Sequence, residues 1–382
     1  MTSRERVLAA LRREEVDHVP CSPTFNPLTE LQRAGHVYGF PWPPGDVKAE
    51  LEHCVRALGI DPVVRCGGGA YFPADGVTAR SWRDGDLLRK VWTTPAGELH
   101  ASVRPDAIWP HGDDIPFWSD FNIGHFVEPW LATEQDLDRL RHVLLPPDRA
   151  QDVERTRTTY RRARELAGRW DLASMASIGS GLTGAHQFCG SEPLCLMVMD
   201  HPALIDAYLE LEHGLNVRHV ALAAEAGIDI VRRNGFYETC DFFGPTMLGR
   251  FLGRRLRGEI DAAHAAGMLT AYTVHTGVMP MLDHLRRLGF DCLLHIDIAF
   301  EGVDLAAIRD SQERAKSFWI GPSGTYHMWS DDPGDVRRAV REVFDVLGRR
   351  GLLLTPCPSA HSIMPWANTL ALIDEWKQLR SP

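Results

Sequence analysis

The sequence LTAYTVHT (residues 269–276) opens the first of four similar units that fill the last third of the chain. The other three begin with DCLLHID (291–297), SFWIGPSG (317–324) and LLLTPC (352–357). Each apolar run is bounded by Gly or Pro and is followed by amphipathic sequence such as PMLDHLRRLG (280–289). This alternation of buried strands with helices predicts parallel βα units.

Four earlier segments extend the same rhythm towards the N-terminus. They are residues 17–25, 62–69, 171–179 and 229–237, which bring the number of expected strands to about eight. The sequence therefore predicts an α/β fold, a (β/α)8 TIM barrel with an N-terminal helical and β-hairpin elaboration. An open doubly wound sheet is the alternative, but no Gly-rich dinucleotide fingerprint follows the first strand.

The segment 77–103 differs from these units because its short alternating runs are separated by turns at 84–85 and 95–97, as in a β-hairpin or meander. Aromatic, irregular sequence follows to about residue 128 and predicts an ordered, packed loop or lid. We expect one domain over 1–382. The elaboration and the first strands occupy about 1–130, and the main repeats about 131–382.

Composition narrows the class of protein. The formal net charge of −10, without a basic stripe, argues against a nucleic-acid partner. No segment approaches the ~18 uninterrupted apolar residues of a membrane span, and the N-terminus resembles an amphipathic helix rather than a secretory signal. Eight Cys residues without paired spacing suggest reduced thiols, so we expect a cytoplasmic protein.

The carboxyl ends of the last four predicted strands carry polar or reactive residues: His275, Asp297, Ser323 and Cys357. In a barrel of parallel strands these ends open onto one face, where the chemistry of such enzymes takes place. Imidazole and thiolate are suitable zinc ligands, so His275 and Cys357 form a candidate metal pair. Zinc needs three or four protein ligands. The candidates for the remaining ligands are Glu238, Cys240, Asp241, His295 and Asp297.

Further polar residues are candidates for contact with a substrate. His361, in the same terminal loop as Cys357, is suited to proton transfer. Asp61 and Arg65, around the second expected strand, could bind or protonate a substrate, although Asp61 could equally be a turn residue. Three residues expected on the same face of the barrel are candidates for binding the substrate: Tyr237, Asp297 and Ser323.

Five stretches of the chain resemble the uroporphyrinogen decarboxylase-like superfamily. They are RERVLAALRREEVDHVP (4–20), TPAGEL (94–99), SGLTGAHQFCGSE (180–192), VHTGVMPMLDHLRRLGFD (274–291) and SAHSIMPWANTLALIDEW (359–376). They occur in the family's order and span nearly the whole chain. The resemblance implies a (β/α)8 barrel with its cleft at the carboxyl ends of the strands, and often a homodimer.

The superfamily holds two broad activities. One branch decarboxylates porphyrinogens without a cofactor, and its N-terminal Arg-rich motif is replaced here by SPTFNPLTELQRAG (22–35), in which Arg33 alone is basic. The other branch moves methyl groups between methylated substrates, a corrinoid on a partner protein and a thiol, often with zinc. Its His-x-Cys pair and distal Cys match His275 and Cys357, but Gly277 stands in place of the middle Cys.

The resemblance favours a methyltransferase over a typical uroporphyrinogen decarboxylase. A small methylated substrate would bind at the barrel mouth, with His275, Cys357 and Glu238 as zinc ligands and His361 handling a proton. Cobalamin on a separate corrinoid protein, or a thiol, would accept the methyl group. The alternatives are a cofactor-free decarboxylase or lyase of a small carboxylic acid, using Asp61, Arg65 and His361, and a non-catalytic accessory subunit.

Overall fold

The computed structural model describes residues 1–23, 41–43, 45–67, 70–312, 315–357 and 365–381. Seven strands form one curled sheet in which all neighbours are parallel. All seven fall inside apolar runs from which strands were predicted. In spatial order the strands are β1 (Val64–Gly67), β6 (Ser174–Ile178), β7 (Ile230–Asn234), β8 (Leu269–Thr273), β9 (Cys292–Leu294), β10 (Ser317–Ile320) and β11 (Leu352–Leu354).

Cys21 lies between the two edges of this sheet. It forms a parallel bridge with Leu354 of β11, and its carbonyl accepts a hydrogen bond of 2.7 Å from the amide of Asp61, just before β1. The strand expected over 17–25 is thus a single bridging residue within the described part of the chain. Of the predicted eight-stranded barrel, the described residues show a curled, seven-stranded parallel sheet that is consistent with it.

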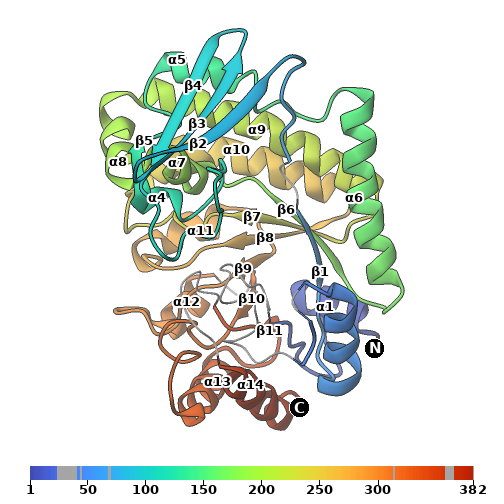
Figure 1. Cartoon of the computed structure of the whole chain (residues 1–382). Coiled ribbons are helices and arrows are strands. Elements are labelled where there is room, and N and C mark those ends of the chain that lie inside the picture. Colours follow the sequence, from blue (N-terminus) through green and yellow to red (C-terminus); the bar gives the residue numbers. More distant parts are fainter. Residues whose placement is uncertain (24–40, 44, 68–69, 313–314, 358–364, 382) are drawn as a thin grey trace.

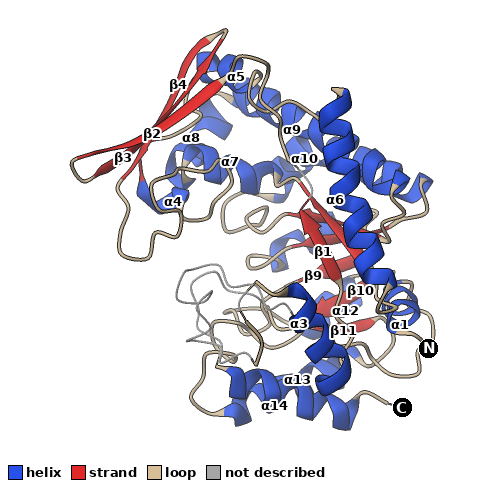
Figure 2. Cartoon of the chain, turned by 45° about the vertical axis from the view of Figure 1, so that its right-hand side comes forward, coloured by secondary structure: helices blue, strands red, loops and turns tan. Residues whose placement is uncertain are grey.

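Helices cover the outer face of the sheet (Figures 1 and 2). The connections between strands carry most of them, as expected of right-handed βα units. The helices that flank the sheet are α3 (Val47–Glu52), the π-helical η1 (His53–Leu58), α6 (Ala150–Gly168), α9 (Pro202–Glu225), α10 (Pro245–Ala265), the 3-10 helix η2 (Met279–Met281), α11 (Leu282–Arg287), α12 (Leu305–Ser311), α13 (Pro333–Leu347) and α14 (Trp366–Leu379). No helix in the described residues is long and apolar enough to cross a membrane.

The predicted hairpin region forms a second, antiparallel sheet beyond the barrel (Figure 1, top). Its strands are β2 (Thr78–Asp84), β3 (Leu87–Thr94), β4 (Gly97–Val103) and β5 (Phe126–Glu128). The aromatic segment after β4 is ordered and packed, as predicted: Phe117 stacks on Phe188 at 5.2 Å, and Trp130 is fully buried. Short helices complete this region: α4 (Asn122–His125), α5 (Glu134–Leu140), α7 (Gly181–Cys189) and α8 (Ser191–Asp200).

The first helix, α1 (Ser3–Leu11), closes the amino-terminal end of the barrel. Thr2 and Glu5 form a capping box at its start. Its apolar face joins one buried cluster with inward-facing strand residues, which we call the barrel floor. The floor is made of Val7, Leu8, Ala10 and Leu11 of α1 with Val63, Ala173, Met175, Ile230, Ala271, Cys292, Leu294, Trp319 and Leu353.

A buried ion pair holds α1 against the strands. The Arg6 guanidinium contacts Asp61 at 2.5 Å and Asp17 at 2.6 Å, and the Asp61 side chain is only 3% exposed. Asp61 also accepts a hydrogen bond from the amide of Cys21. Because Asp61 precedes β1, this pair lies at the amino-terminal end of the sheet, where it links α1 to the bridging residue Cys21.

Replacing Arg6 with Met should lower the free energy of unfolding by about 3 kcal/mol or more, because the buried Asp61 carboxylate would lose its counter-charge. Chemical denaturation of both proteins measures the difference. The matched control is Arg56→Met, which breaks an exposed pair with Glu52 and should cost at most about 0.5 kcal/mol. Equal losses in the two variants would contradict this account of α1.

Candidate functional site

His275, Asp297 and Cys357 form the one group of three potential metal ligands among the described residues. Their ligand atoms all lie within 4.8 Å of one another, and His275 Nε2 is 3.8 Å from Asp297 Oδ2. They follow β8, β9 and β11, so the carboxyl ends of three strands bring them together. The proximity of His275 and Cys357, 82 positions apart in the sequence, agrees with the prediction that placed both at one face.

Neighbouring side chains hold the first two members of this group in place. The His275 ring stacks on Phe236 with centroids 4.2 Å apart, and its carbonyl accepts from the Asp297 amide at 3.0 Å. Asp297 Oδ2 accepts the hydroxyl hydrogen bond of Ser323 at 2.8 Å, and Oδ1 accepts from the Ala299 amide. Ser323 thus orients the carboxylate rather than facing open solvent.

The third member is fixed by an unusual backbone conformation at His295. This residue has a φ of 69°, which non-glycine residues rarely adopt, and its carbonyl accepts the Cys357 thiol at 3.1 Å. Burial, followed by the nearby Asp297 carboxylate, raises the pKa of the Cys357 thiol well above its usual value. A positive charge beside the sulfur is therefore needed to favour the thiolate.

His275 is poised as a neutral imidazole. Burial lowers its pKa, although the carboxylates of Asp297 and Asp241 oppose that effect. Its Nε2 atom is buried and has no hydrogen-bond partner among the described residues. A neutral ring nitrogen facing a carboxylate and a thiol is the form in which histidine binds metals.

Gly277 has no room for a side chain. Its φ is 58°, and a Cβ atom there would lie 2.6 Å from the backbone nitrogen of Asp241. Asp241 is itself held by the hydroxyl of Thr276 at 2.5 Å, and the Cys240 amide donates to the Gly277 carbonyl. The loop after β7 thus occupies the space that a side chain at 277 would need.

Glu238, the third ligand expected from the sequence, lies in a different environment. It is fully buried, accepts hydrogen bonds from the Tyr272 hydroxyl and the Leu182 amide, and lies 3.5 Å from the Arg233 guanidinium. Burial raises its pKa to about 7, despite the opposing charge of Arg233. Both oxygens have partners outside the metal group, so Asp297 is the carboxylate beside His275.

The other predicted site residues are distributed as follows. Asp61 is held by Arg6 at the opposite end of the sheet. Arg65 lies on β1, and Tyr237 lies just past β7 among aromatic rings, 5.4 Å from that of His186. His361 lies outside the described residues. Of these four, Arg65 points into the barrel, because Val63, two positions earlier on the chain, belongs to the barrel floor.

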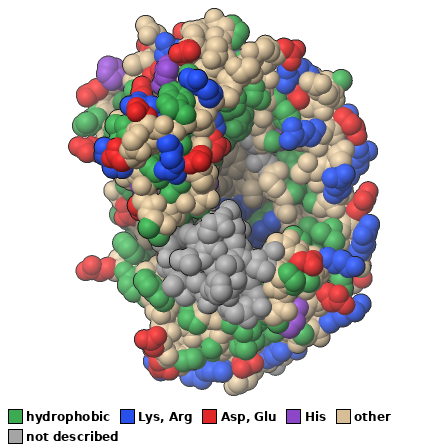
Figure 3. All heavy atoms as spheres, in the orientation of Figure 1, with side chains coloured by type: hydrophobic (Ala, Val, Ile, Leu, Met, Phe, Trp, Pro, Cys, Tyr) green, Lys and Arg blue, Asp and Glu red, His purple; other side chains and the backbone are tan. Residues whose placement is uncertain are grey.

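Sequence reasoning missed Arg232, which lines a cavity of about 200 Å³ at the carboxyl ends of β6 and β7. Ser177, Gly179 and Asn234 line the same cavity. Figure 3 shows a hollow beside the hairpin region, with Lys or Arg side chains visible inside it. Two adjacent arginines within a buried strand, RR at 232–233, were the signal in the sequence.

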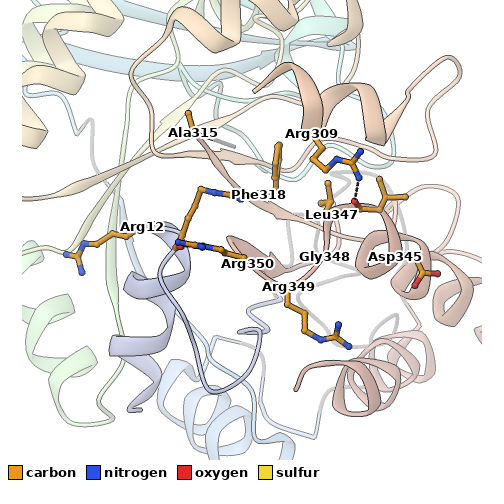
Figure 4. A pocket seen from close by; sticks show the side chains of 11 residues that line it. Arg12, Arg309, Ala315, Phe318, Asp345, Leu347, Gly348, Arg349 and Arg350 are labelled. Carbon is orange, nitrogen blue, oxygen red and sulfur yellow. Dashed lines mark hydrogen bonds between the residues drawn. The ribbon is translucent and has the colours of Figure 1, made fainter. Parts of the chain in front are cut away.

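A larger cavity, of about 800 Å³, lies at the other end of the barrel near the start of β10 (Figure 4). Arginines surround it, but several donate to backbone carbonyls: Arg13 to Lys316, Arg309 to Val346 and Arg349 to Leu379. These contacts tie chain segments together. Barrels of this kind carry their chemistry at the opposite face.

No protein-family model matches the chain, and no curated protein matches it in sequence. Among solved structures, a methyltransferase from Methanosarcina mazei superposes with a TM-score of 0.60 at 18% identity, covering 99% of each chain. A B12-independent methionine synthase from a Shewanella species matches over 58% of this chain and 64% of its own, at 10% identity and a TM-score of 0.43. The first match shows a shared fold over the whole chain.

Introducing the missing cysteine, by Gly277→Cys, should destabilise the protein by roughly 2 kcal/mol or more, because of the positive φ and the contact with Asp241. Thermal unfolding measures the effect. As a control, Gly214→Ala in α9, where a Cβ meets nothing within 4 Å, should stabilise by about 0.5–1 kcal/mol. A Gly277→Cys protein as stable as the parent would show that the loop has room for a side chain.

Proposed function

We propose that this protein is a metal-assisted methyltransferase in which His275, Asp297 and Cys357 bind a zinc ion. The methyl group would come from a small methylated substrate and pass to a corrinoid on a separate protein or to a thiol. The observation that carries this proposal is the convergence of these three side chains at the carboxyl ends of β8, β9 and β11. The fold shared over the whole chain with a protein described as a methyltransferase supports it.

The donor set suits zinc. One imidazole nitrogen, one carboxylate oxygen and one thiolate leave a fourth position of the tetrahedron open, as in catalytic zinc sites. A nitrogen and an oxygen ligand of such a tetrahedron lie roughly 3.3–3.5 Å apart. His275 Nε2 and Asp297 Oδ2 lie 3.8 Å apart, so a small movement of the two side chains would bring them to that spacing. The unpartnered Nε2 of His275 is the atom that would bind the ion.

Bound zinc would supply a Lewis acid that lowers the pKa of a thiol or water in the open position. The chain's own residues prepare that chemistry. Ser323 orients the Asp297 carboxylate, Phe236 fixes the plane of His275, and the His295 carbonyl positions the sulfur of Cys357. Asp297 and Cys357 are buried and His275 is partly buried, which limits the access of water and strengthens their electrostatic interaction with a cation.

The lyase alternative has less support because its residues do not converge. It requires Asp61 to exchange a proton with a substrate, yet the Asp61 carboxylate is paired with Arg6 at the amino-terminal end of the sheet. The zinc ligands lie at the carboxyl ends of the strands, on the other side of the barrel floor. The structure therefore favours the methyltransferase.

The purified chain should bind about one zinc ion per molecule, and His275→Ala, Asp297→Asn and Cys357→Ala should each lower the bound metal strongly, since each removes a ligand. Elemental analysis after dialysis against a weak chelator measures this. Cys292→Ala is the matched control for Cys357→Ala, because Cys292 is an equally buried thiol in the barrel floor. It should keep the metal, as should Glu238→Gln.

Catalysis would be tested with small methylated substrates and cob(I)alamin, by following methylation of the corrinoid in its absorption spectrum. The zinc-loaded protein should accelerate the transfer, and the Cys357→Ala protein should not. A folded, metal-free parent, or equal zinc in parent and ligand variants, would overturn the proposed centre.

A further inference from the structure

Two arginine side chains project into the barrel directly above its floor. Along each strand alternate side chains point to opposite faces. Val63 and Ile230 belong to the barrel floor, so the residues two positions later, Arg65 on β1 and Arg232 on β7, face the same interior. Only β6 separates the two strands, and its inward residues there are Met175, which pairs with Arg65, and the small Ser177, which pairs with Arg232.

Neither guanidinium has a hydrogen bond or an ion pair with any described residue, and buried nitrogen atoms of both lack partners. Burial and mutual repulsion lower the pKa of Arg65 to about 9, and burial lowers that of Arg232 to about 10. The carboxylate that acts on Arg65, Glu50, does not come within ion-pair distance. Two like charges without a counter-charge destabilise the ligand-free interior.

The neighbouring Arg233 shows the opposite arrangement on the same strand. It faces outward, where Glu259 of α10 lies 3.0 Å away, Glu212 of α9 3.7 Å and Glu238, just past β7, 3.5 Å. Burial alone would lower its pKa, but these three carboxylates raise it. Among the described residues, three acids thus surround Arg233, and none forms an ion pair with Arg65 or Arg232.

The two inward arginines lie beside the candidate metal group. Arg232 lines the cavity of about 200 Å³ together with Ser177 and Asn234, whose neutral side chains can donate hydrogen bonds. Glu212 also lines it, but its carboxylate accepts from the Ser180 and Gly181 amides and lies 3.7 Å from the Arg233 guanidinium. His295 lies between the two groups: its carbonyl accepts a hydrogen bond from the Cys357 thiol, and its ring is near enough to Arg232, Arg65 and His275 for their charges to act on it. A ligand that reached from the arginines to the candidate metal group would have cations at one end and His275, Asp297 and Cys357 at the other.

We propose that Arg65 and Arg232 bind the anionic group of the substrate, a carboxylate, sulfonate or phosphate, while its reacting end lies at His275, Asp297 and Cys357. Guanidinium groups suit such planar or tetrahedral oxyanions because they donate two parallel hydrogen bonds. The anion would supply the negative charge that no described residue provides in contact with Arg65 and Arg232. For the reacting end of the substrate this inference rests on the proposed function. For the other end it names the chemical class, an oxyanion.

The experiment compares thermal unfolding of the zinc-loaded full chain with propionate, ethanesulfonate or methyl phosphate against neutral propionamide, at constant ionic strength. At least one anion should raise the melting temperature by binding the folded state, and propionamide should not. Arg65→Met and Arg232→Met should each weaken that binding about tenfold or more, since each removes a charge-assisted hydrogen bond. The anion with the largest shift identifies the preferred group.

A second readout separates binding from structure. Without added anion, Arg65→Met and Arg232→Met should melt at the parental temperature or higher, because each relieves the repulsion between unpaired charges. Arg233→Met should melt lower, because it leaves three carboxylates unpaired, and it should keep the anion response. Should that variant fail to fold, Arg157→Met, which breaks an exposed pair with Glu225, provides the control that keeps the response.

Anion responses that persist in both inward variants, or no response to any anion in the parent, would overturn the inference. Zinc content measured on the same samples keeps the two proposals apart. A metal-free parent that still responds through Arg65 and Arg232 supports the anion site and contradicts the zinc centre. A zinc-loaded parent that binds no anion contradicts the anion site alone.

Discussion

The apolar floor of the barrel is the constraint on which the rest of the structure depends. Helix α1 and inward residues such as Val63, Ile230 and Leu353 bury one another there, which fixes the face to which each strand directs its side chains. Since side chains alternate along a strand, the positions two and four residues later also point inward. The floor therefore determines that Arg65, Arg232 and the residues after the strands gather in one interior, on the side away from α1.

Charge is distributed unequally across this sheet. Outside it, Arg233 is neutralised by three carboxylates within a low-dielectric contact between strand and helices. Inside it, two arginines have no carboxylate of the described residues within ion-pair distance, and a histidine, an aspartate and a cysteine lie together. Leaving buried charges unpaired costs stability, so natural structures keep them mostly where a ligand supplies the missing charge. The interior is thus arranged for binding rather than for stability.

The apolar runs of the sequence predicted the parallel strands, because a strand that is buried on both faces must itself consist mostly of apolar residues. It overestimated the strand at 17–25, where pairing depends on the distant Leu354 and leaves one bridging residue, Cys21. His275 and Cys357 could be placed together because both end strands. Glu238 could not be assigned correctly, since its partner Arg233 and the acids on α9 and α10 meet it only in the folded chain. The obstruction at Gly277 by Asp241 likewise arises from tertiary packing.

The central claim is that a single thiolate, with nitrogen and oxygen donors, holds a zinc ion at the mouth of the barrel. X-ray absorption spectroscopy at the zinc edge, on the zinc-loaded protein, measures this ligand shell directly. The account predicts one sulfur at about 2.3 Å and two or three lighter atoms at about 2.0–2.2 Å. A shell with no sulfur, or with several, would contradict it.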